Sequence, residues 1–223
     1  MIQRAKKYIK PCFFTLSMGF FLLHPLSAEF SPIASLSFGF SEATFARQAL
    51  QTAREQKVRK ILSRFHTGLQ AEEEQRLAIF IVAESQRHQF DPELIIALIS
   101  TESSFYNWST SPKGAIGLMQ MIPTTAKEVA EVSKVDWKGE APLFDPFTNI
   151  KLGIHYLSTL NAKFGDLTLA LTAYNYGPTH VVRWVESGEE IPTKYAEKVL
   201  KHYQEFLGLA PEEKEETETF PSV

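Results

Sequence analysis

The chain has 223 residues, of which 44% are hydrophobic, 12% aromatic and 22% charged. This composition supports a buried core and excludes a compositionally disordered protein. The formal net charge of −3 lacks the basic excess of nucleic-acid-binding proteins, so we expect no nucleic-acid partner. Six histidines without HExxH spacing and a single cysteine, Cys12, argue against a zinc site. We expect neither a metal nor a cofactor.

Residues 1–28 have the order of a secretory signal peptide. Basic residues without any acid precede the apolar run from Cys12 to Leu23, and the segment ends at Ala28, a small residue suited to a cleavage site. The run is about 12 residues, shorter than the roughly 20 that a membrane-spanning helix needs. Cleavage is therefore favoured over an uncleaved anchor, and in both cases we expect a periplasmic or otherwise exported protein.

The remaining sequence shows helical periodicity and no sustained strand alternation. Residues 29–70 are predicted to form an irregular linker, over residues 30–40, and a helical extension of one or two helices over residues 41–69. An all-α domain is predicted over residues 71–208, and an acidic, disordered tail over residues 209–223. The helices predicted within the domain cover residues 71–88, 91–103, 123–132, 146–164, 167–174, 180–186 and 194–207.

Glu102 is the residue that most suggests chemistry. It follows the apolar run Leu94–Ile99, and Ile95, Ile99 and Glu102 share one face of the predicted helix. Desolvation and the negative end of the helix dipole would both oppose ionisation of this carboxyl group. A carboxylic acid that stays protonated near neutral pH can act as a general acid. A glutamate in the last turn of a helix is more often simply exposed to solvent. Whether Glu102 is catalytic therefore depends on the rest of the sequence.

Three sequence blocks accompany Glu102: ESSF at residues 102–105, GAIGLMQMIP at residues 114–123 and AYNYGP at residues 173–178. The glycines of the second block predict either a loop that approaches a ligand closely or a tight turn between helices. The Tyr and Asn of the third block suit hydrogen bonds to sugar hydroxyls, but they also fit a helix cap.

These three blocks, in this order, resemble the lysozyme-like catalytic domain of the family 1 soluble lytic transglycosylases, over about residues 71–207. The resemblance implies an all-α, goose-type lysozyme-like domain, here with an N-terminal helical extension. It also implies cleavage of the β-1,4 bond between N-acetylmuramic acid and N-acetylglucosamine in peptidoglycan, with formation of 1,6-anhydromuramic acid. Glu102 would then be the single catalytic acid and base.

The resemblance assigns further residues to the substrate. Ser111 would lie near Glu102, and Tyr195 resembles a tyrosine that the family places after its last block, although helical packing is an alternative. The family often has Asn-Pro after the catalytic block, where this chain has Asn107-Trp108. Trp108 is expected either to stack on a sugar or to fill the core, and we favour the core. The residues expected to bind substrate are Ser111, Met119, Gln120, Tyr174, Asn175 and Tyr195.

A second catalytic carboxylate would indicate a hydrolase. Asp91 and Asp145 each precede a proline and are explained as helix caps, Glu84 fits an exposed helical face, and Glu140 has no independent claim. Two alternatives stay open: a goose-type-lysozyme-like muramidase, in which water attacks, and a non-catalytic cell-wall-binding module. We expect peptidoglycan glycan strands as the partner, and a cell-envelope protein that binds residues 41–70 or the acidic tail.

Overall fold

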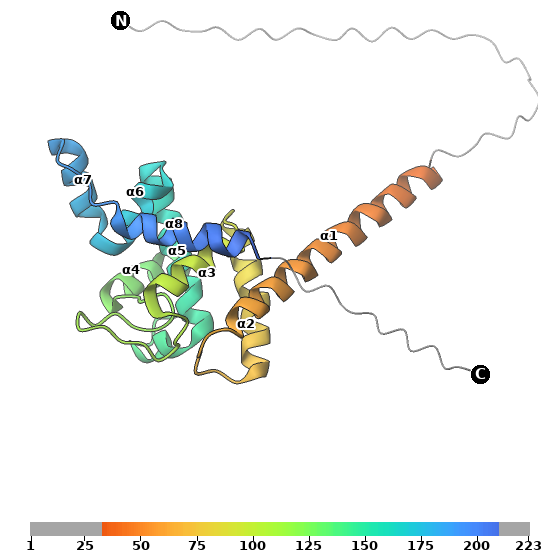
Figure 1. The fold of residues 1–223 in the computed structure, drawn as a ribbon, viewed down its shortest axis with the longest axis horizontal. Helices are drawn as coiled ribbons and strands as arrows, with labels where there is room; N and C mark the ends of the chain where they lie inside the picture. The colour runs from red at the N-terminus through yellow and green to blue at the C-terminus, as the bar shows by residue number, and fades with distance from the viewer. Residues whose placement is uncertain (1–32, 210–223) are drawn as a thin grey trace, which may run out of the picture. The chain divides into compact units, whose positions relative to one another are not determined.

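The computed structural model describes residues 33–209, so the predicted leader and almost all of the predicted acidic tail lie outside the described residues. Over residues 33–209 the chain forms α-helices, one 3-10 helix and no β-strand, which confirms the all-α prediction (Figure 1). No helix in this range has both the length and the apolar character needed to cross a membrane. The elements are α1 (Ile33–Leu62), α2 (Ala71–Arg87), α3 (Pro92–Ser103), α4 (Pro123–Ser133), η1 (Ala141–Phe144), α5 (Pro146–Phe164), α6 (Leu167–Tyr176), α7 (Pro178–Ser187) and α8 (Lys194–Leu207).

Helix α1 starts earlier than predicted. Residues 33–40 are helical, whereas the sequence pattern suggested an irregular linker there. No proline follows Pro32 in this stretch, and Gly39 inside a helix costs only about 1 kcal/mol relative to alanine. The division between the two compact units of the chain falls after Ser41, inside α1, and the packing described below belongs to the unit Glu42–Val223.

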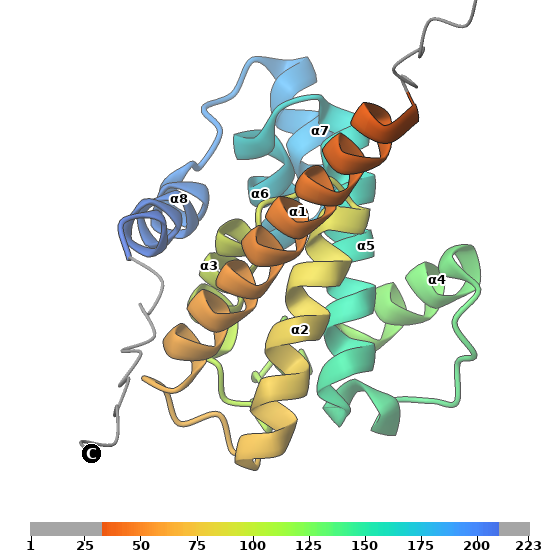
Figure 2. The same ribbon diagram turned by 90° about the vertical axis from the view of Figure 1, so that its right-hand side faces the viewer.

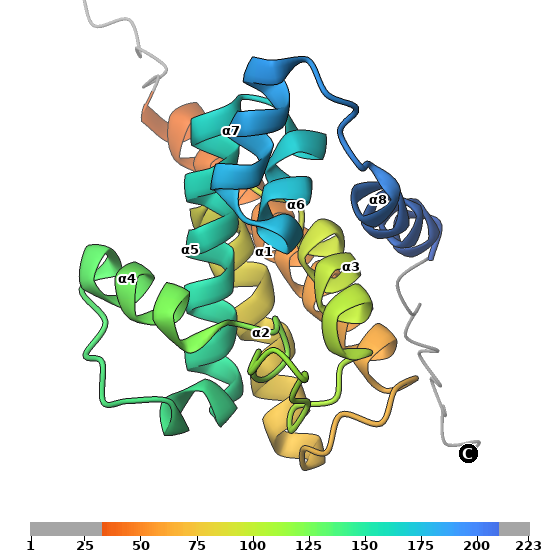
Figure 3. The same cartoon turned by 90° about the vertical axis from the view of Figure 1, so that its left-hand side faces the viewer.

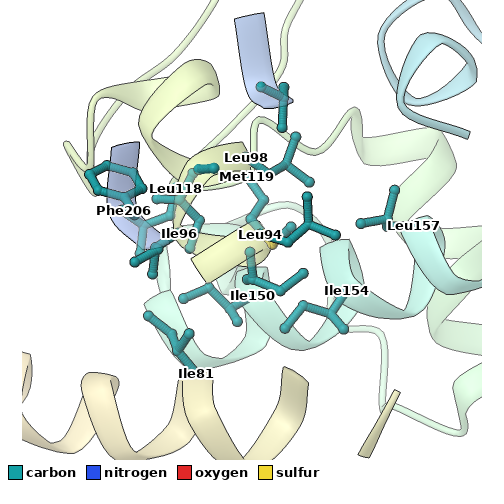
Figure 4. Close-up of a cluster of buried hydrophobic side chains, with 14 of the residues drawn as sticks. Ile81, Leu94, Ile96, Leu98, Leu118, Met119, Ile150, Ile154, Leu157 and Phe206 are labelled. Carbon is teal, nitrogen blue, oxygen red and sulfur yellow. The ribbon is translucent and has the colours of Figure 1, made fainter. Parts of the chain in front are cut away.

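Helix α3 is the centre of this second unit. Its residues from Leu94 to Ser100 are all buried, as expected for a helical segment that is apolar on every face. It packs between α2 and α8, and α2 in turn packs on α5 (Figures 2 and 3). Figure 4 shows the side chains that meet around α3, among them Ile81, Leu94, Ile96, Leu98, Ile150, Ile154 and Phe206.

The last turns of α1 also belong to this core. Val58, Ile61 and Leu62 are buried in the same cluster. The ammonium group of Lys57 lies 3.0 Å from the carboxylate of Glu93 and donates to the backbone carbonyl of Leu207 at 3.2 Å. Residues 57–62 of α1 therefore form part of the core around α3.

Asn149 of α5 holds the long loop between α3 and α4. Its side chain is 0% exposed, accepts a hydrogen bond from the Met119 amide at 2.8 Å, and donates to the carbonyls of Ile116 and Leu143 at 2.8 and 2.9 Å. Gly117 lies against this amide with φ +80, and a Cβ there would come within 2.4 Å of Asn149 Nδ2. Only glycine allows this approach, because a side chain at this position would collide with Asn149.

Two predicted helix caps differ in their side-chain contacts. Asp145 caps α5 as expected, since its carboxylate accepts from the Thr148 amide at 2.8 Å. Asp91 occupies the N-cap position of α3 but makes no side-chain cap hydrogen bond. Its carboxylate instead accepts a hydrogen bond from the Tyr203 hydroxyl of α8, so the predicted N-cap position of Asp91 is confirmed although its side chain does not cap the helix. The neighbouring helix offers a hydroxyl that the sequence could not place.

Candidate active site

The side chain of Glu102 lies in the last turn of α3, at the edge of the core. Burial raises the pKa of this carboxyl group from 4.5 to about 7, and this effect exceeds the opposing ones of the Tyr195 hydrogen bond and the nearby Lys198 charge. A carboxyl group with this pKa is protonated in a large fraction of molecules at neutral pH. Glu102 can therefore both donate and accept a proton there.

Tyr195 is placed beside Glu102 because α8 packs along α3. Its hydroxyl donates a hydrogen bond to Oε1 of Glu102, and its ring packs against the core. Burial, followed by the negative charge of Glu102, raises the pKa of Tyr195 well above its usual value, so the phenol stays a donor. Tyr195 thus packs in the core and contacts Glu102, whereas a contact of Tyr195 with substrate stays a prediction.

Tyr174, at the C-terminal part of α6, supports the wall of the site. Its hydroxyl donates to the backbone carbonyl of Met119 at 2.8 Å, so this hydroxyl is engaged by the protein. Burial, with a smaller contribution from the charge of Glu102, raises the pKa of Tyr174 well above its usual value. Its ring lies 5.3 Å from that of Tyr156, centroid to centroid.

Ser111 begins a tight turn at the other wall. Its amide donates to the Ala115 carbonyl at 2.9 Å, and its hydroxyl accepts from the Ala115 amide at 3.0 Å. Gln120 has φ 47, and its side-chain amide donates to the carbonyls of Ser109 and Gly117 at 3.1 and 2.9 Å. These bonds make the loop a rigid surface.

Met119 differs from its expected role. Its side chain is 0% exposed and belongs to the core cluster, packed closely against Gly153. The expectation that this side chain lines a groove is corrected: only the Met119 backbone carbonyl takes part in the site, through Tyr174. An apolar side chain next to the central core is buried in preference to being exposed in a polar cavity.

These walls enclose an open cavity of about 430 Å³, a volume that suits a small ligand or part of a polymer. Five of the seven predicted site residues line it, and Met119 and Tyr195 lie behind its surface. Across residues 33–209, no three acidic, histidine or cysteine side chains are grouped so as to hold a metal ion. The lining residues are Glu102, Ser111, Lys113, Ala115, Gln120, Ile122, Tyr174, Asn175, Tyr176, His180 and Trp184.

One end of the cavity is aromatic, and the sequence did not predict it. His180 and Trp184 lie four residues apart on α7, a spacing that predicts a shared face, whereas Tyr176 ends α6 and joins them only through the fold. The rings of Tyr176 and Trp184 lie 5.5 Å apart, and those of His180 and Trp184 lie 5.9 Å apart. This end offers aromatic faces beside the polar groups around Glu102.

No described carboxylate other than Glu102 lines the cavity. Glu84 was expected on an exposed helical face, but it is 2% exposed, and its carboxylate accepts from Arg87 at 2.8 Å and lies 3.6 Å from the His88 ring. Because α2 turns this face toward α5, the expectation for Glu84 was wrong. Asp91, Glu140 and Asp145 also lie away from the cavity lining.

Trp108 does not fill the core, contrary to our expectation. It is 52% exposed, and its ring stacks on Phe144 with centroids 5.8 Å apart. The buried residue of this segment is Asn107, which donates to the Phe144 carbonyl at 3.0 Å. With this polar anchor facing inward, the following tryptophan points outward.

Comparisons with known proteins identify the family of this chain. The transglycosylase SLT domain family matches residues 79–196. A putative soluble lytic murein transglycosylase of Haemophilus influenzae is 38% identical over 91 residues, which are 40% of this chain and 15% of that protein. A membrane-bound lytic murein transglycosylase C of Edwardsiella ictaluri is 38% identical over 109 residues, which are 44% of this chain and 30% of that protein.

A solved structure shares the fold. The 70 kDa soluble lytic transglycosylase of Escherichia coli superposes with a TM-score of 0.53 and 27% identity, over 59% of this chain and 24% of that one. The chain thus spans less than a third of the length of each of these three proteins. The matched region contains Glu102 and both walls of the cavity, and this chain belongs to the transglycosylase SLT domain family.

Proposed function

We propose that this protein is a peptidoglycan lytic transglycosylase. It would cleave the β-1,4 bond between N-acetylmuramic acid and N-acetylglucosamine and leave a 1,6-anhydromuramic acid end. The observation that carries the proposal is the cavity whose described lining has a single carboxyl group, that of Glu102, with a pKa that burial raises to about 7. The family membership and the names of the relatives support the same chemistry.

The proposed reaction uses Glu102 twice. The protonated carboxyl group gives its proton to the glycosidic oxygen, the bond from that oxygen to C1 of muramic acid breaks, and N-acetylglucosamine leaves with a free 4-hydroxyl. The resulting carboxylate takes the proton of the muramic acid 6-hydroxyl as its oxygen bonds to C1. Glu102 ends protonated, water is not consumed, and no second protein carboxylate is required.

The neighbouring groups suit this double role. The Tyr195 hydrogen bond stabilises the ionised carboxylate and lowers the pKa that burial alone would produce, which keeps it near 7. Ser111, Gln120 and Asn175 line the cavity with hydroxyl and amide groups that can hydrogen-bond sugar hydroxyls and acetamido groups.

A muramidase on the same fold is the second candidate function. An inverting hydrolase needs a second carboxylate about 6.5–9.5 Å from the acid to activate water, and among residues 33–209 none lines the cavity. This observation favours attack by the substrate's own hydroxyl. A wall-binding module without catalysis would not need this acid, since a buried carboxyl group with a raised pKa lowers the stability of the folded protein when it ionises.

Mass spectrometry of digested peptidoglycan tests the proposal. Purified sacculi are incubated with the full chain, with Glu102→Gln, and with Glu140→Gln, which makes the same change at an exposed site outside the cavity. We expect anhydromuramyl products from the wild type and Glu140→Gln, and a loss of at least about 100-fold in rate for Glu102→Gln. Reducing muramyl ends would establish the muramidase, and sacculus binding without products would establish the wall-binding module.

The proposed substrate, peptidoglycan, lies outside the cytoplasm, so we propose that the protein is exported. The order of charges and apolar residues in residues 1–28 supports export, as do relatives named soluble and membrane-bound murein transglycosylases. A cell-envelope protein partner is proposed for residues 41–70, where Phe45 and Leu50 of α1 are exposed. Photo-cross-linking in cells from position 45, with position 127 of α4 as the control, tests this partner proposal. The absence of an adduct specific to position 45 would contradict the proposal.

A further inference from the structure

Lys113 lies at the rim of the cavity, on the turn that Ser111 begins. This turn is held at both ends, by the paired hydrogen bonds of Ser111 and Ala115 and by the Gly114 amide, which donates to the Ser111 carbonyl at 2.9 Å. Gly114 has φ +79, a left-handed conformation that suits a tight turn. The backbone that carries Lys113 is therefore ordered before any ligand binds.

The charge of Lys113 is not balanced within the cavity. The described lining contains one acidic residue, Glu102, and two basic ones, Lys113 and His180. Glu102 is neutral in a large fraction of molecules at neutral pH, since burial raises its pKa to about 7. Across the described residues, the Lys113 ammonium group has no ion-pair or hydrogen-bond partner. An anion from a ligand would meet a free cation and no competing carboxylate on this wall.

The proposed substrate carries such an anion at one defined place. Its sugar rings are neutral, and the lactyl ether on O3 of muramic acid ends either in its own carboxylate or in a peptide stem with free carboxylates. We propose, building on the proposed function, that Lys113 is a specificity-determining residue that binds the anionic substituent on O3 of muramic acid. Lys113 would thereby distinguish peptidoglycan from neutral N-acetylglucosamine polymers.

Equilibrium binding of three probes tests this role in the Glu102→Gln background, which prevents turnover. The probes are a peptidoglycan tetrasaccharide with its peptide stems, the same tetrasaccharide with stems removed by an amidase, and neutral chitotetraose. Lys113→Gln is compared with Lys113→Arg, which keeps the charge, and with Lys127→Gln, an exposed lysine of α4 outside the cavity.

We expect Lys113→Gln to weaken binding of an anionic probe by about threefold to fivefold, which is the range of an exposed ion pair, and to leave chitotetraose unchanged. Lys113→Arg and Lys127→Gln should bind all probes as the parent does. An effect on the stem-bearing probe assigns the contact to a stem carboxylate, and one on the stem-free probe assigns it to the lactyl carboxylate. Either result supports the proposal.

An equal loss on chitotetraose, or no loss on either anionic probe, overturns it. If Lys113→Gln does not fold, the parent protein still decides: its affinity for an anionic probe must fall as salt rises, while its affinity for chitotetraose stays constant. A failure of the proposed function would be seen in a different measurement, the digestion of sacculi. The wild-type enzyme would then release no anhydromuramyl products, whatever the binding results for Lys113.

Discussion

The hydroxyl of Tyr195 donates a hydrogen bond to the carboxylate of Glu102, although 93 residues separate them in the sequence. The contact depends on α8 packing along α3, which brings the start of α8 to the end of the buried helix. Burial raises the Glu102 pKa and Tyr195 lowers it, so the protonation state of the acid follows from two opposing effects of the tertiary structure.

Tyr195→Phe should therefore move the pH dependence of activity. Without the hydroxyl, the ionised form of Glu102 loses a hydrogen bond, and its pKa rises above about 7. Because the proposed first step needs the protonated form, activity falls as pH rises through this pKa, and the variant should lose activity at higher pH than the wild type. The measurement is kcat/KM against pH. Tyr203→Phe, which removes a hydroxyl bound to the exposed Asp91, is the control and should leave the profile in place.

Glu102→Gln should stabilise the protein at neutral pH. The folded pKa of about 7 lies above the unfolded value of 4.5, so between these values the folded state binds more protons and stability falls as pH rises. Glutamine removes this dependence, and the gain should reach up to about 3 kcal/mol at pH 8 and vanish below pH 4.5. Urea unfolding at pH 4 and pH 8 measures it. A difference between wild type and variant that is the same at both pH values, or also present in Glu140→Gln, would contradict this assignment.

Gly117→Ala should disrupt the loop more than Gly114→Ala does. Both glycines have positive φ, +80 and +79, so alanine costs about 1–2 kcal/mol of backbone strain at each. At Gly117 the new Cβ would also lie 2.4 Å from Asn149 Nδ2 and 2.6 Å from the Leu143 carbonyl, while at Gly114 nothing lies within 4 Å. Thermal unfolding should show a larger loss for Gly117→Ala. Equal losses would mean that the approach to Asn149 is not the constraint.

Asn149→Ala should destabilise the protein by about 2–4 kcal/mol, because it leaves the Met119 amide and the Ile116 and Leu143 carbonyls without their buried partner. Asn161→Ala, on a half-buried position of the same helix, should cost within about 0.5 kcal/mol. Denaturant unfolding of both variants checks this. Activity should fall with Asn149→Ala even at temperatures where it is folded, since the loop it holds forms one wall of the cavity.

Local signals predicted most of the helices. The bounds of α5 and α8 match the prediction, and for α5 the reason is visible: Asp145-Pro146 starts the helix, and Gly165, at φ +65, ends it. Leu94–Ile99 predicted a buried helix because a run that is apolar on all sides can lie only in a core. These features depend on neighbouring residues and need no knowledge of the fold.

The sequence by itself determined the all-α class, the buried helix that ends at Glu102 and the blocks that resemble the family. Only the tertiary structure decided that Glu84 is buried, that Trp108 is exposed, that Met119 packs in the core and that Lys113 and the aromatic residues after Tyr174 share one cavity. Helical periodicity indicates which residues share a face, but which faces meet depends on the packing of α2, α5 and α8 around α3. The pKa of Glu102 belongs to this second group, since burial and Tyr195 act on it only after the helices have packed.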